Sequence, residues 1–163
     1  MIETERLTLR RPTEADVASP PPWLSDPEVM DWLGGIEQPP GDVVRIWLEQ
    51  WERFPTGKLL VHRRDDDALV GAVGTNYYDE ETWTRSPDGV PELGWALARE
   101  HWGHGYASEA ALAYRDRLAA PRVISLIVPA NLRSQAVAER LGAQPERSIE
   151  LPGYGEHVVW VHP

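Results

Sequence analysis

The chain contains no cysteine. This absence excludes a disulfide framework, a thiolate metal site and a cysteine nucleophile, so a covalent mechanism would need another residue. No apolar run approaches the roughly 20 residues that a membrane span needs. The first residues mix both charge signs and lack the apolar segment of a secretory signal. We therefore expect a cytoplasmic protein that does not act on a membrane.

Basic residues are few relative to acidic ones. The chain has 26 Asp and Glu against 16 Lys and Arg, a formal net charge of -10 at pH 7. Nucleic acid is therefore not an expected partner, whereas a cationic small molecule or peptide would be attracted. The alternative explanation is that the acidic excess serves solubility alone. A length of 163 residues suits one core and is short for two, so residues 1–163 should form a single domain.

Hydrophobic periodicity predicts strands and helices in a mixed order. Strands are expected over residues 6–10, 58–62, 69–75, 92–98, 123–128, 147–151 and 157–161. Helices are expected after Thr13 and over residues 42–54, 106–118 and 131–141. Thr13 and Asp42 would cap the first two helices, and Gly142 would end the last. This order predicts a single layered α/β structure.

Two glycines one residue apart stand where an expected strand passes into an expected helix. The first N–H groups of a helix are free, and glycine lets a ligand approach the backbone closely. Gly103 and Gly105 therefore predict an anion site, for a phosphate or pyrophosphate. The alternative is that a tight turn needs glycine in any case. Ser108 stands where a Rossmann motif has its third glycine, and no P-loop lysine follows, so neither nucleotide site is expected.

The same stretch carries a resemblance to a known family. Residues 91–110, P-E-L-G-W-A-L-A-R-E-H-W-G-H-G-Y-A-S-E-A, and residues 131–143, N-L-R-S-Q-A-V-A-E-R-L-G-A, resemble the GNAT superfamily of acyl-CoA-dependent N-acetyltransferases. With the N-terminal E-T-E-R-L-T-L-R-R-P-T-E-A-D, the similarity is greatest to the branch of ribosomal-protein N-terminal acetyltransferases. The resemblance covers nearly the whole chain and is loosest over residues 19–54. It implies an α+β fold whose mixed, mostly antiparallel sheet has about six to seven strands, with about four helices on both faces.

The resemblance also implies that acetyl-CoA is the acetyl donor. Main-chain amides of the glycine loop would bind the pyrophosphate, a role that falls on Gly103, His104, Gly105, Tyr106 and Ala107. The strand edge formed by Leu97, Ala98 and Arg99 would pair with the pantetheine arm, and a backbone N–H near Leu97 would polarise the thioester carbonyl. Asn131 would bond the pantetheine amides. Glu100 departs from the family, which usually has Gln or Arg there.

Acetyl transfer to an amine needs an uncharged nucleophile, a donor for the oxyanion and a proton for the departing thiolate. The resemblance makes Glu92 the candidate general base, directly or through water; the alternative is an exposed carboxylate at the start of a strand. Ala138 replaces the tyrosine that often serves the leaving group, so Ser134 is the candidate that contacts or protonates the thiolate. Asn131 and Ser134 could instead serve only to cap a helix.

These features predict an acetyl-CoA-dependent N-acetyltransferase that works by direct attack in a ternary complex, since no cysteine is available for an acyl-enzyme. The acceptor would be a primary amine, from a protein or peptide N-terminus to an aminoglycoside-type antibiotic. The competing interpretation is an acyl-CoA-binding module without activity, because the helix tyrosine is missing and Ala143 replaces a common aromatic residue. The sequence leaves a homodimer open.

Two further patterns in the sequence have simpler explanations than a binding site. His101 and His104 lie near no other ligand cluster, so no metal is expected. Acidic and aromatic side chains could form an entrance for an amine, although core packing is the simpler explanation for each tryptophan. The residues of this hypothetical entrance are Trp23, Trp32, Trp83, Asp79, Glu80 and Glu81.

Overall fold

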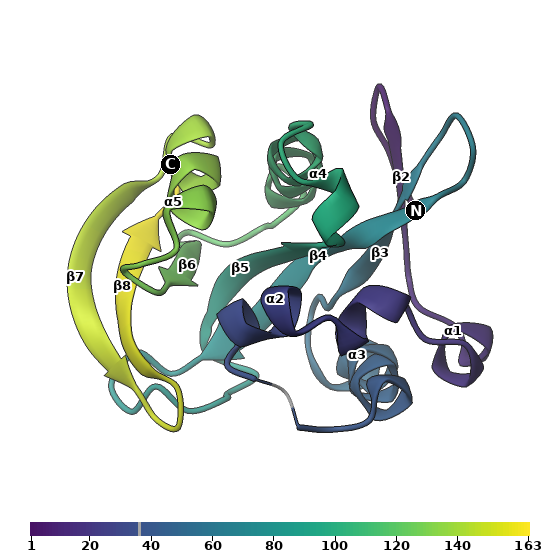
Figure 1. The fold of residues 1–163 in the computed structure, drawn as a ribbon. Coiled ribbons are helices and arrows are strands. Elements are labelled where there is room, and N and C mark those ends of the chain that lie inside the picture. Colours follow the sequence, from purple (N-terminus) through teal and green to yellow (C-terminus); the bar gives the residue numbers. More distant parts are fainter. Residues whose placement is uncertain (36) are drawn as a thin grey trace.

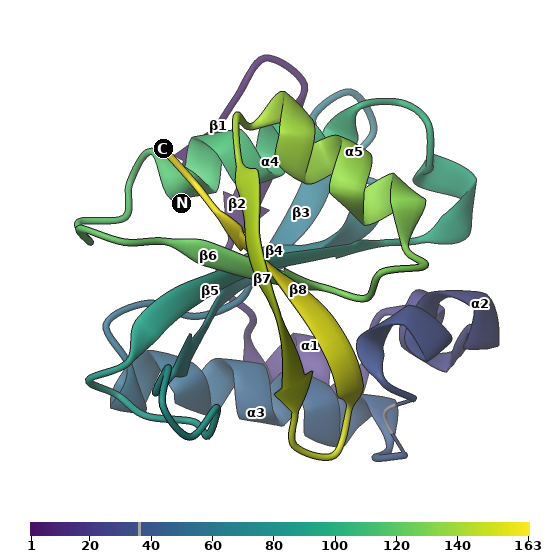
Figure 2. The same ribbon diagram turned by 90° about the vertical axis from the view of Figure 1, so that its left-hand side faces the viewer.

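One sheet runs through the molecule, with helices on both of its faces (Figures 1 and 2). The computed structural model describes residues 1–35 and 37–163. Within them the sheet has eight strands in the order β1-β2-β3-β4-β5-β6-β8-β7, and all pairs are antiparallel except β5 with β6. The mixed, mostly antiparallel sheet is confirmed. The expected counts were slightly low, because the described residues form eight strands and five α-helices.

The strands are β1 (Ile2–Glu3), β2 (Leu7–Arg10), β3 (Leu59–Arg63), β4 (Leu69–Tyr78), β5 (Val90–Leu97), β6 (Ile124–Ile127), β7 (Gln144–Leu151) and β8 (Gly155–Val161). The α-helices are α1 (Glu14–Ala18), α2 (Pro27–Met30), α3 (Pro40–Arg53), α4 (Tyr106–Arg115) and α5 (Leu132–Arg140). Three 3₁₀ turns are η1 (Pro22–Ser25), η2 (Asp31–Leu33) and η3 (Arg99–His101). Among the described residues, no helix combines the length and the apolar character that crossing a membrane requires.

The helices form two layers. Helices α4 and α5 cover one face of the sheet, and α1, α2 and α3 lie against the other (Figure 2). Leu59 and Val61 of β3 belong to the core under α4, whereas Leu60 between them packs with Val43 and Val44 of α3. Because both faces of the central strands are buried, these strands are continuous apolar runs rather than alternating ones.

Most of the expected helix ends are confirmed by the observed caps. Thr13 and Asp16 form a capping box at the start of α1, and Gly142 follows α5 in the left-handed region with a φ of 79°. The prediction that Asp42 caps α3 is wrong, because α3 begins at Pro40 and Asp42 lies in its first turn. Its carboxylate there still faces the positive end of the helix.

Two short elements and one helix end differ from the expectation. β1 has two residues, too few for a periodic pattern, and pairs with β2. Helix α2 was not expected, although its signal is present: Asp26 caps it by accepting from the Glu28 N–H, and Pro27 follows at its first position. Helix α4 ends at Arg115, three residues before the expected Leu118.

A buried histidine ties three central strands together. The Ser125 hydroxyl of β6 donates to the Leu93 carbonyl of β5 at 2.6 Å, and Nε2 of His162, which follows β8, lies 2.9 Å from the same hydroxyl. Because the hydroxyl proton goes to Leu93, Nε2–H of His162 must be the donor in this contact. Burial, aided by the Arg115 charge, lowers the pKa of His162 to about 4.

Stability should therefore fall as the pH is lowered from about 6.5 to about 4. In that window the unfolded chain binds a proton that folded His162 refuses, since the ordinary pKa of 6.5 drops to about 4 on folding. Above this window the residue adds no pH dependence. We expect a loss of about 2 kcal/mol after allowing for solvent screening. Urea unfolding between pH 7 and pH 4 measures it.

His162→Asn is the comparison, because the variant cannot take up this proton. Carboxylates also titrate near the lower end of the window. The informative quantity is therefore the difference in the free energy of unfolding between the wild type and His162→Asn at each pH. That difference should shrink as the pH falls. A constant difference at every pH would show that folding does not shift the pKa of His162.

Candidate active site

Strands β5 and β6 part near the middle of the sheet. They pair at a single position, Glu92 with Ile124, whereas β4 and β5 pair over the whole of β5. The carbonyls of Leu93 and Leu97 accept bonds from Ser125 Oγ and Trp102 Nε1. The backbone polar groups of Leu93 and Leu97 therefore point away from β4. Strand geometry then turns the N–H groups of Trp95 and Leu97 to the same open side. The strand edge thus offers backbone donors where β6 has moved away.

The expected strand edge of Leu97, Ala98 and Arg99 is only partly available for pairing. Leu97 and Ala98 are buried, and the Ala98 N–H already donates to the Val70 carbonyl. Arg99 begins η3, and its side chain forms ion pairs with Asp26 at 3.2 Å and Glu28 at 2.8 Å. The Arg99 side chain thus links η3 to the start of α2.

The glycine loop ends in free backbone donors at the start of α4. Gly103 and Gly105 have φ values of 79° and 78°, the left-handed region that other residues enter only with strain. Within the described structure, the N–H groups of residues 103–108 make no hydrogen bond. A Cβ on Gly103 would meet nothing within 4 Å. The loop therefore has both the donors and the open space that a pyrophosphate needs.

Glu92 is a buried carboxylate with one oxygen fixed and one free. Its residue exposure is 7%, so the alternative of an exposed carboxylate is wrong. Oε2 accepts from Nδ2 of Asn76, the residue paired with it on β4, at 3.0 Å, and Asn76 in turn accepts from Gln50 of α3 at 3.1 Å. Oε1 accepts no hydrogen bond from any residue that the structure describes. Glu92 thus has an oxygen available for a proton.

Asn131 and Ser134 meet at the start of α5. Asn131 caps the helix, and its Oδ1 accepts from the Ser134 N–H at 3.1 Å. The capping role is therefore present. The Ser134 hydroxyl has no bond to the described residues and is half-buried. A role of either side chain toward pantetheine or sulfur stays a prediction.

Comparison with known proteins now adds to this geometry. A family model described as an acetyltransferase (GNAT) domain matches residues 6–144. The chain belongs to the GNAT acetyltransferase family. This GNAT domain is 30% identical to the Bacillus subtilis (strain 168) protein YkkB over 157 residues, which are 91% of this chain and 87% of YkkB.

Solved structures agree on the fold. An acetyltransferase from Agrobacterium tumefaciens str. C58 is 30% identical, with a TM-score of 0.81 over 99% of this chain and 93% of that one. AAC(6')-Ib in complex with paromomycin and acetyl-CoA has a TM-score of 0.76 over 97% and 93% of the two chains. At 20% identity this second likeness shows the GNAT fold alone. The branch of the family stays a prediction.

In this GNAT domain a clamp holds the glycine loop. Arg6, just before β2, donates through Nη1 to the His104 carbonyl at 2.9 Å and through Nε to Glu109 of α4 at 2.7 Å. Thr4 donates to the other Glu109 oxygen at 2.6 Å. The Arg6 guanidinium also lies 4.7 Å from the centre of the Tyr106 ring. Fixing the His104 carbonyl fixes the direction of the loop amides, so Arg6 orients donors that it does not itself supply.

Arg6→Met should therefore raise the KM for acetyl-CoA by about tenfold with little change in the KM for the amine. Initial rates with each substrate varied in turn measure both constants. Arg64→Met is the matched control, because Arg64 bonds the neighbouring Thr4 carbonyl at 2.7 Å and makes no bond to the loop. Equal losses in the two variants would mean that the clamp supports stability only.

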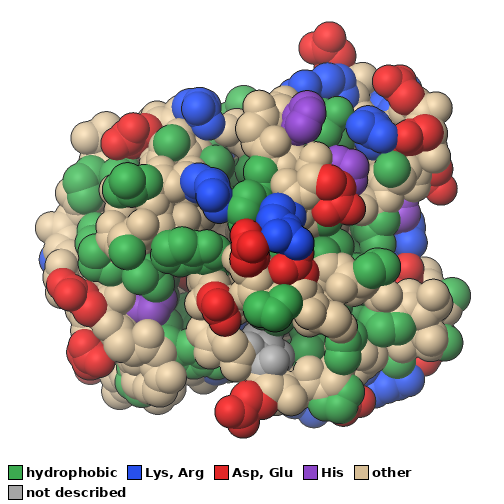
Figure 3. Space-filling view, viewed as in Figure 1, with side chains coloured by type: hydrophobic (Ala, Val, Ile, Leu, Met, Phe, Trp, Pro, Cys, Tyr) green, Lys and Arg blue, Asp and Glu red, His purple; other side chains and the backbone are tan. Residues whose placement is uncertain are grey.

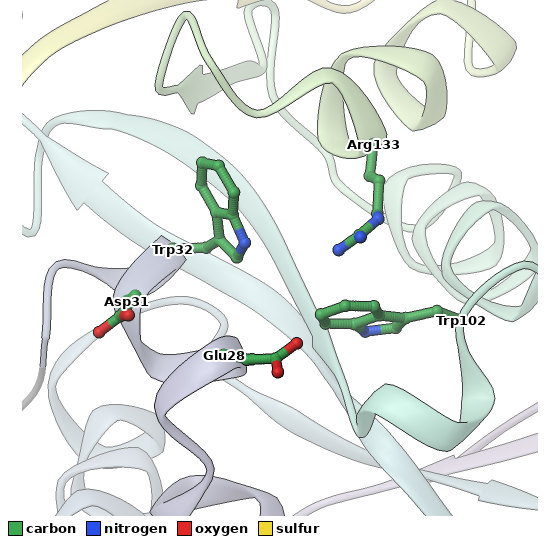
Figure 4. A pocket seen from close by; sticks show the side chains of 5 residues that line it. All are labelled: Glu28, Asp31, Trp32, Trp102 and Arg133. Atoms are coloured by element: carbon green, nitrogen blue, oxygen red, sulfur yellow. The ribbon is translucent and has the colours of Figure 1, made fainter.

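A cavity of about 300 Å³ bridges the two helical layers (Figure 4). Trp102 lies on one side with the Arg133 guanidinium above it, 4.1 Å from the ring centre, and Trp32 stands across from them (Figure 4). Glu28 points toward Trp102, whereas Asp31 points away (Figure 4). Sequence reasoning placed Trp32 near such an entrance but missed Trp102 and Arg133, which join it only through the fold.

The hypothetical acidic and aromatic entrance is not assembled as expected. Trp23 is buried and stacks on Trp47 at 6.1 Å, and Trp83 lies beneath Arg147. Glu80 forms ion pairs with Arg122 and Arg147. Acidic side chains are spread over both layers on the face shown in Figure 3. The net charge therefore does not single out one acceptor site on this face.

Proposed function

We propose that this GNAT domain is an acetyl-CoA-dependent N-acetyltransferase that moves an acetyl group to a primary amine by direct attack in a ternary complex. The observation that carries the proposal is the set of unpartnered N–H groups at residues 103–108. Helix α4 has ten residues, so the positive end of its dipole adds to these donors. AAC(6')-Ib, which shares the fold, binds acetyl-CoA, and this supports the same donor here.

The donor would lie along the open edge of β5. The loop amides would take its pyrophosphate, and the free N–H groups of Trp95 and Leu97 would bond the pantetheine amides and the thioester carbonyl. Asn131 and Ser134 stand at the start of α5, the helix that follows β6. In this role Ser134 contacts the sulfur, and Asn131 bonds the pantetheine arm with the amide nitrogen that its capping contact leaves free.

The acceptor amine would meet Glu92. The free Oε1 of Glu92 takes a proton from the protonated acceptor amine. The neutral nitrogen of the acceptor then attacks the thioester carbonyl carbon. A carbon–nitrogen bond forms, collapse of the tetrahedral intermediate breaks the carbon–sulfur bond, and the positively charged nitrogen releases its second proton to solvent to give the amide. Glu92 then returns the proton that it took to solvent. The thiolate takes its proton from the Ser134 hydroxyl, which solvent restores. No covalent acyl-enzyme is required, consistent with the absence of cysteine.

Calorimetry with acetyl-CoA and thiol release across a panel of amines test the proposal together. The panel contains peptides with free N-termini, a polyamine, amino-acid amides and an aminoglycoside, the last because AAC(6')-Ib binds one. Saturable binding with turnover on at least one amine is expected. Binding without turnover on any amine would favour the acyl-CoA-binding module, and no heat with acetyl-CoA would remove the donor site.

A further inference from the structure

Lys58 is the only lysine in the chain, and the other 15 basic residues are arginines. It directly precedes β3, where its carbonyl accepts from Trp51 Nε1 of α3 at 2.9 Å. The residue is half-buried and its ammonium group lies inside the protein. In the described structure this ammonium makes one hydrogen bond, to the Gly74 carbonyl at 3.1 Å. Lysine differs from arginine in carrying a compact charge whose pKa shifts readily on burial. A single buried lysine with two unused donors is therefore a candidate for a specific role.

Two glycines lie beside Lys58, one against its backbone and one near its ammonium group. Gly74 of β4 and Gly94 of β5 are paired across the sheet. A Cβ on Gly74 would lie 2.4 Å from the Gly57 carbonyl oxygen, so no side chain fits there. A Cβ on Gly94 would lie 3.4 Å from both Lys58 Nζ and Glu92 Oε1. Lys58 Nζ and Glu92 Oε1 are therefore no more than twice that distance apart, and both lie near the position that a Gly94 side chain would take.

We infer that Lys58 is a positioning residue for the base: its ammonium, held above the paired glycines, keeps buried Glu92 ionised and its free Oε1 ready to take the acceptor's proton. The inference rests on the proposed function. Burial would otherwise favour the protonated carboxylic acid, which cannot act as a base. Asn76 holds only Oε2, so Lys58 supplies the charge that faces Oε1.

Among residues 1–35 and 37–163, Glu92 is the acidic group whose charge acts on Lys58. Burial lowers the pKa of Lys58 to about 8, the nearby Glu92 carboxylate opposes that fall, and Arg85 adds to it. Tyr78 of β4 stays neutral, because burial and Glu92 raise its pKa to about 12. Helix α3 contributes Gln50, which is uncharged. The Glu92 carboxylate thus stabilises the charged form of Lys58.

The rate test is the pH profile of Lys58→Met. Without the ammonium, protonation of Glu92 should move the acid limb of kcat/KM up by one pH unit or more. At pH 9, well above the acid limb of both profiles, the rates should agree within about threefold. A loss of equal size at every pH would overturn the inference, since that is the result of a structural defect.

A second measurement needs neither catalytic turnover nor the Lys58→Met variant. Because the chain has one lysine, its side chain gives a single set of NMR signals next to the ammonium group. The chemical shift of these signals, followed against pH, gives the titration midpoint of Lys58. The midpoint should lie well below that of a free lysine and fall further in Glu92→Gln. Glu150→Gln, an exposed carboxylate on β7, is the control and should leave it unchanged. An unchanged midpoint in Glu92→Gln would overturn the coupling, whereas absent turnover with a shifted midpoint would count against the proposed function instead.

Discussion

Glu92→Gln is expected to lower kcat/KM for the amine by about a hundredfold or more near pH 7, with the affinity for acetyl-CoA retained. The amide keeps the shape of the carboxylate and can still bond Asn76, but it cannot take a proton. The loss should be largest at low pH, where the acceptor is protonated, and should shrink as the amine loses its proton unaided. Thiol release measured over a pH series, with calorimetry on acetyl-CoA, separates the two effects.

Glu150→Gln is the matched control for this loss. It removes the same charge from an exposed position on β7, so its rate should stay near that of the wild type. If Glu92→Gln kept the wild-type rate and pH profile, Glu92 would not be the base. A parallel loss of acetyl-CoA affinity would instead point to a disturbance of β5.

Gly105→Ala is expected to weaken acetyl-CoA binding by tenfold or more. Gly105 is the N-cap residue of α4, with a φ of 78°. A residue with a Cβ pays about 1–2 kcal/mol in this region, and the loop can relieve that strain by turning its amides away from the ligand. A new Cβ would also lie 3.5 Å from Arg6 Nη2, the clamp that holds the loop. Calorimetric titration with acetyl-CoA measures the change in Kd.

Gly153→Ala separates lost binding from lost stability. Gly153 has a φ of 82° and nothing within 4 Å of an added Cβ, and it lies in the turn between β7 and β8, outside the glycine loop. Both variants should unfold at lower temperatures than the wild type. Only Gly105→Ala should lose acetyl-CoA affinity, and equal affinities in the two variants would count against the loop as the pyrophosphate site.

Local patterns in the sequence predicted several strands and helices and the glycine loop. Alternation in residues 6–10 marked β2, and the spacing of Val43, Trp47 and Trp51 marked α3, because each segment buries one face. Gly103 and Gly105 marked the loop, because only glycine takes a positive φ without strain. These signals lie within one element or one turn, and there the sequence suffices.

The remaining features join residues that are distant in the chain. Arg6 and Glu109 meet because β2 runs beneath the start of α4, and no local pattern connects them. The pairing of Gly74 with Gly94 depends on the register between β4 and β5. Alternation along a strand shows which face is buried but leaves its neighbour unknown. The approach of Lys58 to Glu92 beside these glycines could therefore be found only from the assembled sheet.

The single bridge between β5 and β6 has a mechanical meaning. It joins a five-stranded portion, β1 to β5, to a three-stranded one, β6 to β8, through Glu92 and Ile124. Ser125 of β6 strengthens this joint through its bond to the Leu93 carbonyl, next to Glu92. The proposed base therefore lies where the two portions are fastened together, and the unpaired edge of β5 begins just beyond it.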